Sequence, residues 1–420
     1  MANSINIDSK RLTDSLQTLG KIGQYKDVAT GLTGVRRLAL SAEDGEGRRH
    51  VVSLMKQAGL TVTIDRIGNV FARREGTNPT LAPMMMGSHI DSVPTAGMFD
   101  GCLGVMSALE VIRTLNDNNI ETLRPVVMAF FTDEEGCRFG VDMLGSAVAT
   151  GRIPLEQAYA LRDRDGLWFK DELEKIGFQG EAPVLLKPPH AYLEVHIEQG
   201  PVLRAKNLDI GVVAGVQAIS WQELTIQGKP AHAGTTPMEL RADAGVAAAR
   251  INLRMREMTE DAKYGTQFRA TMGAIRPHPG LVNIIPGQVI ATVDVRNPED
   301  AFLKKAEADL IAFYDEVARR EKVKITWRQT ARTDSVRFND TVQALVSKGA
   351  TSRNLKSERI ISGAGHDAQE MSHICRAGMV FVPGEFDGIS HNPREFSTPE
   401  QCANGVNVAL DVVLALANEA

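Results

Sequence analysis

The chain has 420 residues, of which 43% are hydrophobic and 24% charged, and its 47 basic and 52 acidic residues give a formal net charge of −5. This length exceeds what one hydrophobic core commonly serves, so we expect two domains. The acidic balance argues against nucleic acid or an anionic membrane as a partner. No apolar run reaches the roughly 20 residues that span a bilayer. Four scattered cysteines and a polar start without a secretory signal favour a cytoplasmic location.

The first 210 residues alternate between helix and strand patterns. Apolar residues recur at helical spacing over 45–58, and T-V-T-I-D-R-I over 61–67 alternates like a strand. The apolar stretch that ends at His89 has the length of a strand. A helix over 103–117, the apolar run V-V-M-A-F-F and a helix near 143–150 follow. This alternation predicts an α/β domain whose sheet is buried and mostly parallel.

The pattern changes after residue 210. Two strands, a helix over 241–257, further strands, a helix over 301–320 and a last strand predict an α+β domain with its helices on one face of a mainly antiparallel sheet. The α/β pattern then returns, with helices over 340–353 and 400–418. We therefore predict a discontinuous domain, residues 1–210 and 330–420, with a smaller domain, residues 211–329, inserted into it. The other face of the smaller sheet would need a partner.

Metal-competent side chains stand where predicted strands end. They are His89 and Asp91, then Glu134 and Glu135, then His196, with Asp100 between glycines and His391 in a late loop. Any one of them alone is typical of a structural residue or a turn. Together they form a set of imidazoles and carboxylates that suits Zn²⁺, or Mn²⁺, Co²⁺ or Ni²⁺. Two ions that share a carboxylate would require about this number of ligands.

Three adjacent carboxylates, Asp133, Glu134 and Glu135, follow the apolar run V-V-M-A-F-F. Like charges this close resist joint ionisation unless positive charge lies nearby. Two divalent cations would offset the negative charge of these carboxylates. We assign no role to Asp133.

Eight motifs occur in order and together resemble one family. They are G-S-H-I-D-S-V-P, G-M-F-D-G-C-L-G, F-T-D-E-E-G-C-R-F, H-I-E-Q-G-P, K-P-A-H-A-G-T-T-P-M, R-N-P, G-A-G-H-D-A and I-S-H-N-P-R-E-F. The chain resembles, over nearly its whole length, the hydantoinase/carbamoylase group of the M20 metallopeptidase-related amidohydrolases. The resemblance implies a zinc-peptidase-like catalytic domain with an inserted, ferredoxin-like dimerisation domain. One departure is Ser92, where the family motif more often has Thr.

The resemblance also implies roles for the metal-competent residues. His89 and His196 would bind one metal each, Asp100 would bridge the two ions, and Glu135 and His391 would complete the ligand set. Asp91 would orient His89. Glu134 would be the general base that deprotonates the metal-bridging water and passes a proton to the leaving nitrogen.

Further residues match those that contact the substrate in members of this family. They are Gln199, Asn283, Arg296 and Gly365, with Arg296 suited to a carboxylate through its two-pronged guanidinium. His232 matches a histidine that reaches across a dimer interface to stabilise the oxyanion, which implies a homodimer.

The implied reaction is hydrolysis of the ureido bond of an N-carbamoyl-L-amino acid to amino acid, CO₂ and ammonia. β-Ureidopropionate and allantoate present a similar carboxylate and ureido group and are alternative substrates. Three other hypotheses are an M20-type dipeptidase or aminopeptidase, a non-catalytic binding protein of the same fold, and a hydrolase that uses Cys102 as its nucleophile. Loss of activity with a chelator and its recovery with a divalent metal would exclude the cysteine mechanism.

Overall fold

The computed structural model describes residues 5–420. The chain forms two compact units, the first comprising residues up to Val216 and from Arg337 onward, the second Gln217–Val336. The sequence-based boundaries, 210/211 and 329/330, lie several residues earlier. Strand β8 (Ile210–Val216) accounts for the first difference, because it pairs with strands of the first unit and not with the inserted one.

The central sheet of the first unit is mixed. Its strands lie in the order β14-β8-β16-β7-β5-β6-β4-β3, with β15 also beside β8. The three neighbours β7, β5 and β6 and the pair β16–β7 are parallel, whereas β3–β4, β4–β6 and β16–β8 are antiparallel. The strands are β3 (Thr61–Ile64), β4 (Val70–Arg74), β5 (Met84–His89), β6 (Val126–Phe131), β7 (Ala191–Ile197), β15 (Ser357–Ser362) and β16 (Arg376–Val382). The expectation of a mostly parallel sheet therefore holds for the central strands and also for the outer pair β15–β8, whereas β16–β8, β4–β6 and β3–β4 are antiparallel.

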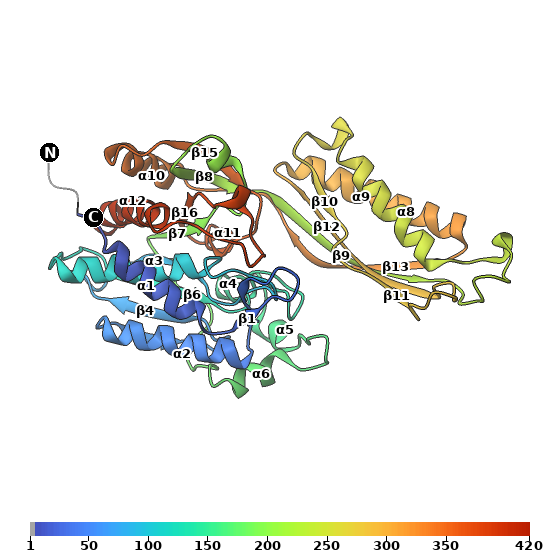
Figure 1. Ribbon diagram of the computed structural model, residues 1–420. Helices are drawn as coiled ribbons and strands as arrows, with labels where there is room; N and C mark the ends of the chain where they lie inside the picture. The colour runs from blue at the N-terminus through green and yellow to red at the C-terminus, as the bar shows by residue number, and fades with distance from the viewer. Residues whose placement is uncertain (1–4) are drawn as a thin grey trace. The chain divides into compact units, whose positions relative to one another are not determined.

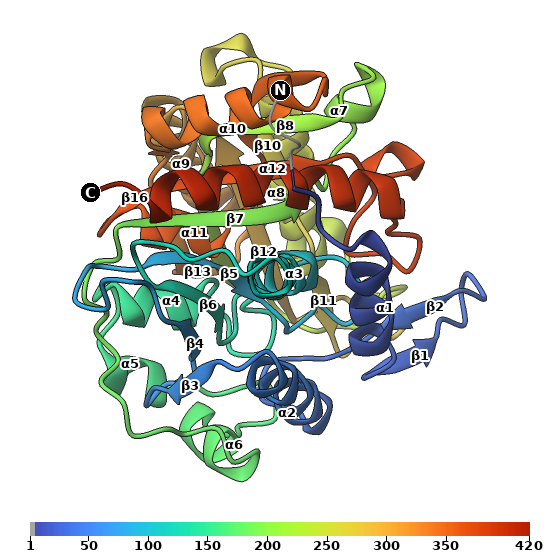
Figure 2. The same ribbon diagram turned by 90° about the vertical axis from the view of Figure 1, so that its left-hand side faces the viewer.

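Helices cover both faces of this sheet (Figures 1 and 2). One face carries α1 (Ser9–Gly20), α2 (Ala42–Gln57), α3 (Cys102–Asp117), α10 (Asp340–Ser352) and α12 (Pro399–Ala417). The other carries α4 (Leu144–Ala149), α5 (Leu155–Tyr159), α6 (Phe169–Lys175) and α11 (Asp367–Met371). Smaller elements are β1 (Gln24–Lys26), β2 (Thr33–Val35), α7 (Val202–Ala205) and β14 (Val336–Arg337). The predicted helices over 103–117, 340–353 and 400–418 agree with α3, α10 and α12 to within a residue at each end.

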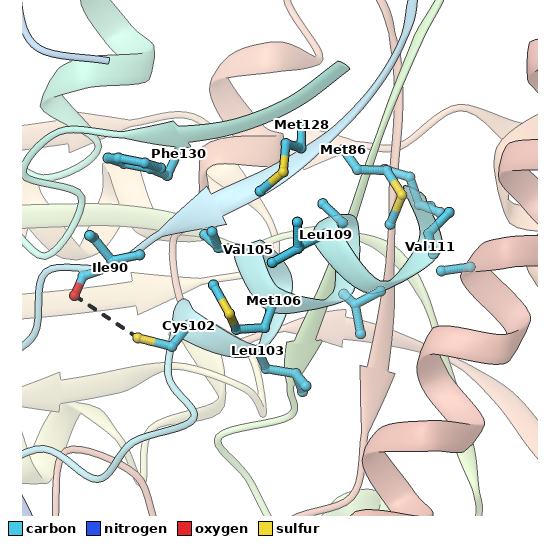
Figure 3. Packing of buried hydrophobic residues seen from close by; sticks show 14 of the residues in the cluster. Met86, Ile90, Cys102, Leu103, Val105, Met106, Leu109, Val111, Met128 and Phe130 are labelled. Carbon is cyan, nitrogen blue, oxygen red and sulfur yellow. Dashed lines mark hydrogen bonds between the residues drawn. The ribbon is translucent and has the colours of Figure 1, made fainter. Parts of the chain in front are cut away.

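Helix α3 lies within the core of the first unit. Leu103, Val105, Met106 and Leu109 are fully buried, and Figure 3 shows them packed with residues of the neighbouring strands. Burial of each such side chain stabilises the fold by about 1.5–3 kcal/mol. In the first turn, the Cys102 thiol points at the Ile90 carbonyl, 4.0 Å away (Figure 3). The start of α3 is therefore fixed beside the end of β5, which is where the metal-competent residues begin.

The second unit is a five-stranded antiparallel sheet with two helices. Its strand order is β10-β12-β9-β13, with β11 also paired to β12. The elements are β9 (Ala218–Gln227), α8 (Ala244–Met258), β10 (Arg269–Thr271), β11 (Ile275–His278), β12 (Gln288–Asn297), α9 (Asp300–Glu321) and β13 (Lys324–Thr333). Both helices pack on one face of the sheet (Figure 1). This is the predicted α+β arrangement. Because β10 and β11 pair with successive stretches of β12, they count as two parts of one strand, and the chain order is then β-α-β-β-α-β, as in a ferredoxin-like sandwich.

None of the helices in residues 5–420 has the length and apolar character that a bilayer crossing demands.

Candidate metal centre

The predicted ligands meet because three neighbouring strands run parallel. His89 is the last residue of β5, His196 is near the end of β7, and Glu134 and Glu135 follow the end of β6. The carboxyl ends of parallel strands lie at the same edge of a sheet. Gly101, with φ at +64°, turns the chain between Asp100 and α3, and a Cβ atom there would collide with the His89 ring. The glycine therefore allows Asp100 to approach the strand ends closely.

His89, Asp100 and His196 form the first group of possible ligands, and all three are buried. The Nε2 atoms of His89 and His196 lie 3.6 and 3.2 Å from the same oxygen, Asp100 Oδ1. Each Nδ1 atom faces a backbone carbonyl, that of Asp91 at 3.0 Å and that of Ile197 at 2.9 Å. Because a carbonyl only accepts, Nδ1 carries the proton in the neutral ring and the Nε2 lone pair points to the centre.

Asp100, Glu135 and His391 form the second group. His391 Nε2 lies 3.4 Å from Asp100 Oδ2 and 3.4 Å from Glu135 Oε2. Asp100 thus faces one group with each of its oxygens, as a bridging carboxylate would. The family resemblance implied separate ions for His89 and His196, whereas the structure groups them together around Asp100 Oδ1.

A third cluster, Glu194, His196 and His366, differs in character. The Glu194 carboxylate already accepts hydrogen bonds from Ser88 Oγ at 2.7 Å, the Ala368 amide at 2.9 Å and Tyr192 Oη at 3.3 Å. These donors occupy both Glu194 carboxylate oxygens, so we interpret the cluster as a buried hydrogen-bond network behind His196 and not as a metal site.

Asp91 contacts His89 through its backbone more closely than through its side chain. Its carboxylate lies 3.8 Å from His89 Nδ1, and its backbone carbonyl, at 3.0 Å, is the closer partner. The carboxylate instead accepts the backbone amides of Glu134 and Glu135, at 3.2 and 3.3 Å. Asp91 therefore fixes His89 through its main chain and the two glutamates through its side chain. Asp133 precedes them at φ +57°.

The electrostatics of the centre fit divalent cations. Burial and the neighbouring carboxylates raise the pKa of Glu134 well above its usual range. Burial, with the nearby Asp100 and Asp91 adding to it, raises the pKa of Glu135 to about 8. Although burial alone would lower it, Asp100 raises the pKa of His196 to about 9. Buried carboxyls held against ionisation are the expected sign of a site built around positive charge, and this nitrogen and oxygen donor set suits Zn²⁺, Mn²⁺, Co²⁺ or Ni²⁺.

Gln199 also joins the centre. Its Nε2 atom donates to Asp100 Oδ2 at 2.7 Å, and its backbone is left-handed, with φ at +55°. Gly365 lies half-buried in the loop between β15 and α11. Two residues that were not predicted from the sequence, Ser390 and Glu395, also contact Asp100. Ser390 Oγ lies 3.0 Å from Asp100 Oδ2, and the Glu395 carboxylate accepts the Asp100 amide at 3.1 Å. Their place beside His391, in I-S-H-N-P-R-E-F, was the signal that could have found them.

Three predicted substrate residues belong to the second unit, and they lie at two ends of its sheet. His232 pairs with Ile284 in an isolated bridge, and the Ala233 amide donates to the Asn283 carbonyl at 3.0 Å. Both segments lie beyond the Gln227–Gln288 end of the β9–β12 pair. Arg296 is near the other end of β12, where its guanidinium contacts the Asp294 carboxylate at 2.7 and 2.9 Å.

Two further details bear on chemistry. His232 Nδ1 accepts the Gly234 and Thr235 amides at 3.0 and 3.3 Å, so in the neutral ring Nε2 carries the proton and can donate. Cys102 is buried, and burial raises the pKa of its thiol to about 11. Because the thiolate is the nucleophilic form, this disfavours the cysteine mechanism.

The fold and the paired imidazole–carboxylate groups are those expected of M20-type amidohydrolases. Comparisons with known proteins agree with this class. The model of peptidase family M20/M25/M40 matches residues 85–415. An N-carbamoyl-L-amino-acid amidohydrolase of Rhizobium meliloti is 40% identical, with 98% of this chain and 97% of that protein covered. A ureidoglycolate hydrolase of Arabidopsis thaliana is 34% identical, with 99% and 88% covered.

Solved structures lead to the same group. The crystal structure of a hydantoinase/carbamoylase family amidase from Burkholderia vietnamiensis matches with a TM-score of 0.95 and 42% identity, and all of both chains is covered. The chain belongs to peptidase family M20/M25/M40, within its hydantoinase/carbamoylase group.

Proposed function

We propose that the protein hydrolyses the ureido C–N bond of N-carbamoyl-L-amino acids, giving the amino acid, CO₂ and ammonia. The observation that carries this proposal is the pair of ligand groups on the two oxygens of Asp100. It occurs in a chain that is 40% identical over its length to an enzyme of that name. β-Ureidopropionate, allantoate and ureidoglycolate are the alternative substrates of the same site.

We assign one divalent cation to each ligand group. His89 and His196 would hold the first ion, Glu135 and His391 the second, and Asp100 would contribute an oxygen to both. When bound, such a pair polarises a substrate carbonyl and lowers the pKa of water so that hydroxide is available near neutral pH.

Glu134 is the general base in this proposal. Its carboxylate Oε2 lies 3.4 Å from His89 Nε2, at the edge of the first ligand group, and its backbone amide is anchored by Asp91. It takes the proton of the attacking water and gives it to the leaving nitrogen. Burial raises the pKa of Glu134, and nearby cations would lower it towards neutrality, the range in which a group both accepts and returns a proton.

The substrate carboxylate is the natural ligand of Arg296. The guanidinium lies on the sheet face opposite α8 and α9, because its neighbour Val295 is in the core beneath those helices. Its present partner is Asp294, which a substrate carboxylate could replace with the same two-pronged geometry. Gln199 and the Gly365 backbone would contact the substrate from the first unit.

The second unit supports a homodimer by its dimensions. Arg296 is eight residues after Gln288 along β12, and at about 3.3 Å per residue this amounts to about 26 Å. His232 and Asn283 lie beyond the Gln288 end, so they and Arg296 of one copy cannot contact the same small substrate. We infer that the His232 Nε2 proton, which would stabilise the oxyanion, and Asn283 act on the site of a second copy.

A substrate panel tests this proposal. Protein stripped with a chelator and reloaded with Zn²⁺, Mn²⁺, Co²⁺ or Ni²⁺ is assayed for ammonia release from N-carbamoyl-L-amino acids, β-ureidopropionate, allantoate and ureidoglycolate. Dipeptide cleavage is assayed beside them. We expect the highest kcat/KM for an N-carbamoyl-L-amino acid. Dipeptide turnover without ammonia release would replace the proposal with a peptidase.

A further inference from the structure

Glu395 makes three hydrogen bonds at the edge of the centre without belonging to either ligand group. Its side chain is buried. Oε1 accepts the backbone amides of Phe99 and Asp100, at 3.0 and 3.1 Å, and Oε2 accepts the Ser390 hydroxyl at 2.7 Å. One carboxylate thus joins the loop that carries Asp100 to the residue directly before His391.

Other contacts align the same two loops. Thr95 Oγ1 donates to the His391 carbonyl at 3.0 Å, and the Glu395 amide donates to the Asn392 carbonyl at 2.9 Å, which closes a turn. Gly97 leaves the space that Glu395 occupies, because a Cβ atom at Gly97 would lie 2.6 Å from Glu395 Cβ. The loop that carries Asp100 and the loop that carries His391 therefore both accommodate the Glu395 side chain.

The chemistry of the carboxylate suits this task better than that of an amide. It can accept at both oxygens, as the two backbone amides and the hydroxyl require. Ser390 Oγ also lies 3.0 Å from Asp100 Oδ2, so a single hydroxyl stands between the Glu395 and Asp100 carboxylates. Because the hydroxyl has one proton, it donates to one of these carboxylates at a time. Glu395 therefore holds the Asp100 backbone directly and keeps the Ser390 side chain beside the Asp100 carboxylate.

We propose that Glu395 is a positioning residue that sets the separation of Asp100 from His391 and thereby the cation affinity of the second ligand group. This inference rests on the metal assignment made under Proposed function. Glu395 acts on the ligands and not on the substrate, so its removal should weaken metal binding more than it changes KM. Loss of groups that orient metal ligands typically costs about 10–100-fold in affinity.

Cobalt binding to the full chain tests the inference. Chelator-stripped wild-type protein is titrated with Co²⁺ by calorimetry and by the visible absorption of the ion, and we expect two binding steps. Glu395→Ala should weaken one step about 10–100-fold and the other much less. Glu395→Gln retains an oxygen for the Phe99 and Asp100 amides and should recover most of the lost affinity.

Two more variants separate positioning from general damage. Gly97→Ala keeps the Glu395 carboxylate but displaces it, and should weaken the same binding step as Glu395→Ala. It therefore tests the inference independently if Glu395→Ala folds poorly. Asp300→Ala is the matched control, since Asp300 also accepts a backbone amide and a hydroxyl, both from Ser335, but lies in the second unit. It should leave both steps unchanged.

The outcomes are distinguishable. Wild-type protein that binds fewer than two Co²⁺ ions would overturn the metal assignment and this inference with it. Two normal steps in wild type that persist unchanged in Glu395→Ala and Gly97→Ala would overturn the inference alone. Equal weakening of both steps would mean that Glu395 supports the fold in general.

Discussion

The candidate metal centre of the first unit and the predicted substrate residues of the second unit differ in burial and in how closely they are grouped. His89, Asp100 and His196 are almost fully buried, and backbone groups fix both histidine rings. His232 and Asn283 are exposed, and they lie at the opposite end of the sheet from Arg296. The first set lies within one unit, whereas we propose that His232 and Asn283 act on the site of a second copy. Substitutions should therefore fail in different ways in the two regions.

The largest effect is expected at the T-D-E-E-G segment. Glu134→Gln keeps the shape of the side chain but cannot accept the proton, so kcat should fall about 10²–10⁴-fold. Metal content, measured by elemental analysis, should stay near two ions per chain. Glu135→Gln is the matched control at the next residue and should lose metal. Equal metal loss in both variants would contradict the division of roles between them.

A comparable effect is expected at His232, and it should be reversible by mixing. His232→Ala removes the oxyanion donor and should lower kcat about 10²–10³-fold. Dissociated and reassociated with Glu134→Gln protein, it should regain about a quarter of wild-type activity, because half of the dimers are mixed and each of those has one intact site.

The mixing experiment decides between the two placements of His232. No recovery, with mixed dimers demonstrated by differential tags, would show that His232 acts within its own chain. Mixing Glu134→Gln with Glu135→Gln is the control, because both residues belong to the first unit and each site of a mixed dimer would still lack one of them.

A smaller effect is expected at Arg296. Arg296→Lys keeps the charge but loses the two-pronged geometry, and hydrogen bonds to charged groups contribute about 1.5–3 kcal/mol. We expect kcat/KM to fall about 10–100-fold, mainly through KM, with metal content unchanged. A substrate analogue without a carboxylate should be turned over equally by the variant and the wild type. A uniform loss on both substrates would argue that the Asp294 pair is only structural.

The smallest effect is a dependence of stability on pH in the metal-free protein. Burial raises the pKa of Asp91 to about 7 and that of Glu135 to about 8. A carboxyl with a raised folded-state pKa adds stability that is present below its unfolded pKa and is lost as pH rises through the folded value. His89, whose pKa burial lowers to about 4, opposes this trend only below its ordinary pKa of 6.5.

The free energy of unfolding in a chelator should therefore fall between about pH 6.5 and 8. Saturating Mn²⁺ should reduce this fall, because cations stabilise the ionised carboxylates. Urea unfolding at both pH values, with chelator and with Mn²⁺, measures it. A metal-free protein that becomes more stable over this range would contradict the role of these carboxyls.

The metal-competent residues could be predicted because strand periodicity and parallel pairing bring strand ends together. His89 and His196 needed only that β5 and β7 be neighbours with the same direction. Their grouping around one Asp100 oxygen could not be predicted, since it depends on which carbonyl each Nδ1 atom meets. For the same reason the sequence could not show that Asp91 would contact His89 through its backbone carbonyl more closely than through its carboxylate.

Other misses have different physical causes. From the sequence, most of strand β8 was predicted to belong to the inserted unit, because nothing in Ile210–Val216 shows which sheet it will join. Glu395 was missed because a glutamate in a polar loop shows no sign of the backbone amides that it will accept. The separation of His232 from Arg296 required the β9–β12 register, which only the structure supplies.

The backbone at three positions has a consequence for how this protein could be altered. Asp133, Gln199 and His391 have φ values of +57°, +55° and +54°. This left-handed conformation costs a residue with a side chain about 1–2 kcal/mol relative to the ordinary helical region. Glycine at these positions would relieve that cost, so a screen that selects only for heat resistance would be drawn towards changes that remove Gln199 and His391 from the centre. Stabilised variants should be sought elsewhere in the chain, with these three positions held fixed.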